Sequence, residues 1–167
     1  MPSNAYDVAV SPDFADPSSD DFGGTVSTIL SIYEGVTMSE QENVALVRRA
    51  YQAFNEGDGA HLSQFLAEDC VQHMPGTGRF GGDQKGRDAV LGMYGQMGEL
   101  SNGIMRAVPE AFFGNGDYVT VIHREQATRN GRTLDDRMCL LFRLENGQAV
   151  ELTDMPENGA SDETFWD

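Results

Sequence analysis

The sequence predicts a single α+β domain in which helices come first and a sheet follows. Apolar residues recur at helical spacing between residues 39 and 100. Alternating apolar segments fill the C-terminal half, and the pairs Asn130-Gly131 and Asn146-Gly147 between them are typical hairpin turns. Helices followed by consecutive strands indicate an α+β fold, and the length of 167 residues suits one such domain with a tail.

The first helix is expected to begin at Ser39. Ser39 and Glu42 fit a capping box, in which the serine side chain accepts from the Glu42 amide and the glutamate reaches back. The apolar residues that follow at helical spacing are Val44, Val47, Tyr51 and Phe54. A turn at 55–59 contains two glycines and ends this helix. A short second helix is expected at about 62–66, and a third at about 87–100.

Strands are expected between and after the helices. A short one falls at 70–74, and the C-terminal strands fall at about 104–111, 118–128, 133–144 and 149–155. The intervening segment 75–86 reads as a glycine-rich loop. Its Gly76–Gly81 stretch fits G-x-G-x-x-G, but it lacks the parallel strand and the helix that a dinucleotide site requires. We expect instead a lid over a pocket, with Arg79 and Phe80 at its tip.

Residues 1–37 differ in composition from the rest of the chain. They contain three prolines, six acidic residues and neither Lys nor Arg. The acidic residues are Asp7, Asp13, Asp16, Asp20, Asp21 and Glu34. This composition predicts a mostly disordered extension, apart from an apolar, β-branched stretch at 25–36. The domain proper is expected to span residues 38–167.

Charge and cysteine content restrict the function classes. The net charge of −16 repels phosphate backbones and anionic lipids, which argues against nucleic acid and membrane surfaces as partners. Cys70 and Cys139 are expected to be buried thiols, because two cysteines make no disulfide framework. The histidines are scattered, so no metal site is predicted. No secretory signal or membrane span is visible, and we expect a cytoplasmic protein.

Several stretches of this sequence are similar to one known superfamily. They read VRRAYQAFNEGD, LAEDCVQHMPG, GRDAV, NGRTLDDRMCLLFRLENGQAVEL and DETFW. Over about residues 40–167 they resemble the SnoaL-like members of the NTF2-like superfamily. The resemblance implies a cone-shaped, cystatin-like roll: three N-terminal helices packed on a curved antiparallel sheet that encloses one pocket. It implies no single activity, since the superfamily includes isomerases, cyclases, epoxide hydrolases, dehydratases and non-enzymes.

The ketosteroid isomerases of this superfamily carry three catalytic side chains that this sequence lacks. Their oxyanion-hole tyrosine falls on Ala50, one residue before Tyr51 and about 100° around the helix from it. Their general-base aspartate falls on Met74, and their protonated aspartate falls near Leu140. All three positions are apolar, which argues against steroid isomerisation by that chemistry.

Limonene-type epoxide hydrolases give a closer partial match. Their last-strand catalytic aspartate falls on Asp154, and their Arg-x-Asp pair falls on His123 and Glu125. Strand alternation places His123 and Glu125 on one face with Val119 and Val121. It likewise places Asp154 on one face with Val150 and Leu152. Polar groups at the end of apolar stripes suit a pocket wall.

These residues predict a cofactor-free enzyme acting on a small hydrophobic metabolite by proton transfer or water addition. Asp154 is the expected general base, with His123 and Glu125 orienting water or donating a proton, and with His73 at the pocket mouth. Burial is expected to raise the carboxyl pKa values and to leave the imidazole able to hold either charge state. The residues expected to contact substrate are Met74, Tyr51, Phe80, Tyr94, Met97, Leu140 and Leu152.

The alternative is a non-catalytic module that binds a small molecule or dimerises, with the N-terminal tail as a docking segment. In that case Glu125 would pair with Arg124 or Arg137 in solvent, and the polar residues would form a rim. Either reading includes a homodimer, because the resemblance implies pairing through the outer face of the sheet. Phe142 and its strand neighbours are expected to supply apolar area there.

Overall fold

The computed structural model describes residues 38–158 and 164–167. The expectations for residues 1–37 therefore lie outside the described residues. In chain order the elements are α2 (Glu40–Glu56), α3 (Gly59–Phe65), β1 (Leu66–Met74), β2 (Gly82–Lys85), α4 (Arg87–Leu100), β3 (Arg106–Asn115), β4 (Tyr118–Arg129), β5 (Arg132–Glu145) and β6 (Gln148–Pro156). Within these ranges, no helix has the length and apolar character needed to cross a bilayer.

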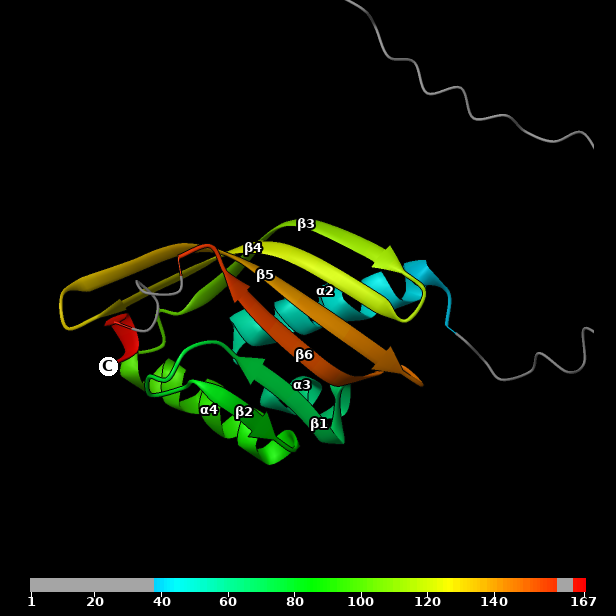
Figure 1. Cartoon of the computed structure of the whole chain (residues 1–167), viewed down its shortest axis with the longest axis horizontal. Helices are drawn as coiled ribbons and strands as arrows, with labels where there is room; N and C mark the ends of the chain where they lie inside the picture. The colour runs from blue at the N-terminus through cyan, green and yellow to red at the C-terminus, as the bar shows by residue number, and fades with distance from the viewer. Residues whose placement is uncertain (1–37, 159–163) are drawn as a thin grey trace, which may run out of the picture. The chain divides into compact units, whose positions relative to one another are not determined.

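The strands form one six-stranded sheet in the order β2-β1-β6-β5-β4-β3 (Figure 1). Strands β3 to β6 form an antiparallel meander, and β2 pairs antiparallel with β1. Strand β1, however, runs parallel to β6, with His73 opposite Thr153. The predicted α+β roll with helices packed on a curved sheet is confirmed, while the sheet is mixed rather than wholly antiparallel.

The element boundaries differ from the expected ones mainly around β1 and β2. Helix α2 begins after Ser39 with the predicted capping box, and α4 has the predicted bounds. Strand β1 begins at Leu66, which was expected in a helix, and β2 lies inside the expected loop. β2 is short and polar, so its strand conformation comes from pairing with residues 71–74 rather than from apolar alternation.

The helices lie on one face of the sheet and leave a cavity between them. Helix α2 packs against β3 and β4, and α4 packs on the same face against β1, near the opposite edge of the sheet (Figure 1). Two asparagines tie α2 to the sheet. Asn43 Nδ2 donates to the Gly116 carbonyl at 3.0 Å, and the Asn55 side chain both donates to and accepts from the Ala107 backbone at 2.8 and 2.9 Å. Tyr51, which lies between these anchors, is thereby fixed against the inner face.

A helical turn at 164–166 covers one end of the domain. Phe165 and Trp166 are buried, and the Arg129 guanidinium donates to both of their carbonyl oxygens. The Trp166 ring packs edge-on against Phe80, with centroids 5.5 Å apart. This contact joins the C-terminus to the glycine-rich loop before β2.

Candidate functional site

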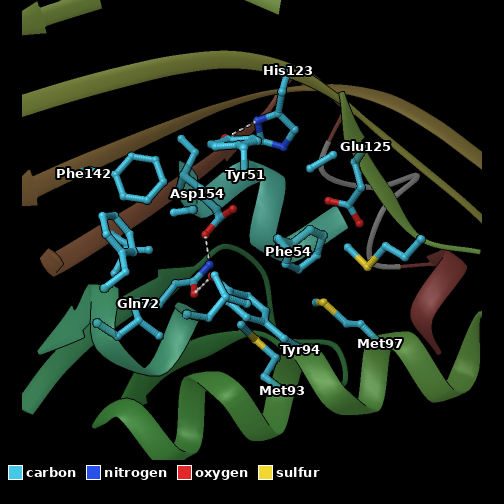
Figure 2. A pocket seen from close by; sticks show the side chains of 18 of the residues that line it. Tyr51, Phe54, Gln72, Met93, Tyr94, Met97, His123, Glu125, Phe142 and Asp154 are labelled. Carbon is cyan, nitrogen blue, oxygen red and sulfur yellow. Dashed lines mark hydrogen bonds between the residues drawn. The ribbon is translucent and has the colours of Figure 1, made fainter. Parts of the chain in front are cut away.

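An apolar cavity of about 70 Å³ lies between the inner face of the sheet and the helices (Figure 2). Its walls are aromatic rings, aliphatic side chains and flexible methionines. The apolar lining residues are Ala50, Phe54, Leu62, Phe65, Leu66, Met74, Met93, Met97, Met105, Ala107, Leu140, Phe142 and Leu152. The remaining lining residues are Tyr51, Gln72, Tyr94, His123, Glu125 and Asp154. The described lining residues include no Lys or Arg. The cavity therefore suits an apolar molecule with a few polar groups.

The three polar residues expected at the centre of the site do converge on this cavity. His123 and Glu125 project inward from β4, and Asp154 projects inward from β6 (Figure 2). His123 is 4% exposed and Glu125 is 7% exposed. Arg124 pairs with Asp135 and Arg137 pairs with Glu110, both in exposed positions. The alternative that placed Glu125 in a solvent-exposed ion pair with either arginine is therefore wrong.

His123 is held by Tyr51. The Tyr51 hydroxyl and His123 Nδ1 are 2.9 Å apart, and the two rings meet edge to face. Burial lowers the pKa of His123 to about 4, so the imidazole is neutral near pH 7, contrary to the expectation of two accessible charge states. Burial, assisted by the Asp154 carboxylate, raises the pKa of Tyr51, which keeps its proton. The pair presents hydrogen bonds to the cavity without a net charge.

Gln72 is a site residue that the sequence analysis missed. Its Nε2 donates to Asp154 Oδ2 at 2.6 Å, and its Oε1 accepts from the Tyr94 hydroxyl at 2.6 Å (Figure 2). Gln72 is 2% exposed and sits on the same face of β1 as Met74. That alternation was a usable signal, because Met74 was already expected in the pocket and Gln72 precedes it by two residues.

His73 does not lie at the cavity mouth as expected. As the neighbour of Gln72 in a strand, it points to the outer face of the sheet. There its ring contacts Asp83 Oδ1 at 2.8 Å through Nδ1 and Glu151 Oε1 at 3.1 Å through Nε2. The hydrogen bond to Asp83, together with that to Glu151, raises the pKa of His73. This arrangement joins β2, β1 and β6 from outside and is separated from the cavity by the sheet.

Phe80 also lies outside the cavity, and the glycine-rich loop is not a lid over it. Phe80 is buried in a second apolar cluster with Trp166, Met93 and Met97, and the latter two form its boundary with the cavity. The Arg79 amide donates to Asp167 Oδ1 at 2.9 Å, so the loop tip faces the C-terminus. The expectation that Phe80 contacts substrate was wrong because Phe80 is buried by Trp166, which lies at the far end of the chain.

The other residues expected to contact substrate all line the cavity. They are Tyr51, Met74, Tyr94, Met97, Leu140 and Leu152. Ala50, Met74 and Leu140, the positions at which the ketosteroid isomerases carry catalytic groups, are among the lining residues. In the described part of the chain, no group of three or more His, Cys, Asp or Glu side chains is placed to hold a metal ion.

Comparison with known proteins identifies the family to which this chain belongs. A model of the SnoaL-like domain matches residues 47–152. An uncharacterized protein of Mycobacterium tuberculosis is 32% identical over 130 residues, which cover 77% of this chain and 99% of that protein. The chain therefore belongs to the SnoaL-like family of the NTF2-like superfamily.

Solved structures show the same fold. Bal32a, from a soil-derived mobile gene cassette, matches with a TM-score of 0.75 and 33% identity, covering 77% of this chain and 98% of that one. IdmH, a putative polyketide cyclase from Streptomyces antibioticus, matches with a TM-score of 0.60 over 70% of this chain and 92% of that one. At 23% identity, the second likeness concerns the fold alone.

Proposed function

We propose that the protein is a cofactor-free enzyme that acts on a small hydrophobic metabolite by proton transfer or water addition, in the manner of a cyclase, isomerase, dehydratase or epoxide hydrolase. The observation that carries this proposal is the convergence of Asp154, His123 and Glu125 on one apolar cavity. Two carboxyl groups beside a neutral imidazole in an apolar cavity are suited to general acid–base chemistry.

Asp154 is the proposed general base. In proton transfer, its carboxylate takes a proton from an acidic carbon, and the electron pair left behind moves onto the adjacent carbonyl oxygen. In water addition, it takes a proton from water as the water oxygen attacks carbon, and the oxygen that leaves that carbon receives a proton from the acid form of Glu125. In either case the His123–Tyr51 pair orients substrate or water by hydrogen bonding, since His123 is uncharged near pH 7.

The cavity must widen to admit a substrate. Its volume of about 70 Å³ is below the roughly 300–1,000 Å³ of typical ligand pockets. Met74, Met93, Met97 and Met105 line it, and unbranched thioether side chains rearrange readily. A neutral ligand is favoured over an anionic one, because the lining includes two carboxyl groups and the chain carries a net charge of −16.

Isotope exchange tests the proposal before the natural substrate is identified. A panel of enolisable ketones and epoxides is incubated with enzyme in D₂O or in H₂¹⁸O, and mass spectrometry follows deuterium or ¹⁸O uptake. Asp154→Asn is expected to lower the rate by about 10²–10⁴-fold while changing ligand binding far less. Thr153→Ala is the matched control, because Thr153 is the neighbouring β6 residue and faces away from the cavity.

The proposal is contradicted if the isotope-exchange rate with Asp154→Asn stays within a few-fold of the rate with the unsubstituted protein. Ligands that bind in the cavity without any exchange would instead favour the non-catalytic binding module.

A further inference from the structure

A short hydrogen-bonded chain runs along the cavity wall from α4 to β6 and ends on Asp154. The Tyr94 hydroxyl donates to Gln72 Oε1 at 2.6 Å, and Gln72 Nε2 donates to Asp154 Oδ2 at 2.6 Å. In Figure 2, dashed lines join Tyr94, Gln72 and Asp154 in this order. Gln72 is therefore the link between the proposed base and the helix that covers it.

Tyr94 determines which way the Gln72 amide points. Burial, together with the nearby Asp154 charge, raises the pKa of Tyr94, so its hydroxyl keeps a proton to donate. A hydroxyl that donates to the carbonyl oxygen of the amide leaves the NH₂ group, which only donates, turned toward Asp154. The ionised Asp154 carboxylate, which only accepts, favours the same orientation, so Tyr94 and Asp154 hold the amide from both ends.

The Gln72 amide affects the two protonation states of Asp154 differently. An N–H donor stabilises a carboxylate more than it stabilises a carboxylic acid, so it favours the ionised form. The amide also does not titrate near neutral pH, so it cannot pass a proton onward.

We propose that Gln72, oriented by Tyr94, is a positioning residue that keeps Asp154 ionised. This inference deepens the proposed function and rests on it, since it concerns the residue assigned as general base. Other groups that line the cavity with Asp154 include His123 and Glu125 of β4 and Tyr51 of α2, and β5 contributes the apolar Leu140. These groups are unchanged by a substitution at Gln72, so a comparison of variants isolates the amide.

The test is a ¹³C NMR titration of the Asp154 carboxyl group in substrate-free protein, with its signal assigned from the Asp154→Asn spectrum. Gln72→Leu is expected to raise the Asp154 pKa by about 1–2 units, or roughly 10–100-fold in proton affinity. Tyr94→Phe keeps the ring and should shift the same pKa in the same direction by less. Gln52→Leu, on the exposed face of α2, is the matched control and should leave it unchanged.

An Asp154 pKa that is unchanged in Gln72→Leu overturns the inference. If Gln72→Leu does not fold, an unchanged Asp154 pKa in Tyr94→Phe overturns the inference instead. The titration requires no turnover, so its result is separate from that of the isotope-exchange experiment. An active Asp154→Asn protein would contradict the proposed general base and would leave the titration result intact.

Discussion

Burial of His123 has a consequence for the stability of the folded protein in acid. In the folded state its pKa lies at about 4, whereas the unfolded chain has the ordinary value of 6.5. Between pH 4 and pH 6.5, the His123 imidazole is protonated in the unfolded chain and neutral in the folded protein. The contribution to stability is therefore fully present above pH 6.5, is lost as the pH falls toward 4, and amounts to about 3 kcal/mol in all.

We expect His123→Gln to remove this part of the pH dependence, because a glutamine can still bond Tyr51 but does not titrate. Free energies of unfolding from urea titrations at pH 7.5 and at about pH 4.5 measure the effect. His61→Gln is the control, since the His61 side chain is 71% exposed. An unchanged acid sensitivity in His123→Gln would show that other groups carry it.

At the scale of elements, the position of α2 depends on the two hydrogen bonds between Asn55 and the Ala107 backbone. Asn55→Ala leaves a partly buried amide and carbonyl without these partners, which costs about 1–3 kcal/mol. We expect a loss of that size in the free energy of unfolding, measured by urea titration. Gln52→Ala, one turn earlier on the exposed face of α2, should cost much less. Equal losses in the two variants would contradict the role of Asn55 as an anchor.

Elements with local signals were the ones that could be predicted from the sequence. The Ser39–Glu42 capping box placed the start of α2, and Asn-Gly pairs placed the hairpins on either side of β5. The parallel pairing of β1 with β6 had no local signal, because register between distant strands depends on tertiary packing. The same limit applied to the site. Alternation placed His123, Glu125 and Asp154 correctly within their strands, while His73 was assigned to the wrong face and Phe80 was separated from the cavity by a distant tryptophan.

At the scale of the whole molecule, the outer face of the sheet carries exposed apolar side chains. Val108, Phe113 and Met155 are 44%, 56% and 43% exposed. Their register partners Arg124, Thr120 and Cys139 alternate with inward-facing residues, so all three point outward. Phe142, which was expected on this face, instead lines the cavity and is 3% exposed. Tyr118 of β4, which precedes the inward-facing Val119, is 48% exposed, so the apolar area available for association comes from β3, β4 and β6.

We predict a homodimer through this outer face. Light scattering should give twice the chain mass of 18.2 kDa at micromolar concentration. A buried carboxylate at an apolar interface is costly, so Phe113→Asp should shift the population toward monomer. Ile104→Asp is the control, because Ile104 is equally exposed at 56% but precedes β3. A monomer before any substitution would exclude the dimer.

The parallel pairing of β1 with β6 also bears on the order in which the chain folds. Residues 72 and 154, which meet in the site, are 82 positions apart in sequence. The hairpins of β3 to β6 close over a few residues each, so the entropy lost in forming them is small. Closing the loop between β1 and β6 costs more and gains contacts only when both strands are formed. We expect the contact between Gln72 and Asp154 to form late in folding, so substitutions where β1 pairs with β6 should speed unfolding more than they slow folding.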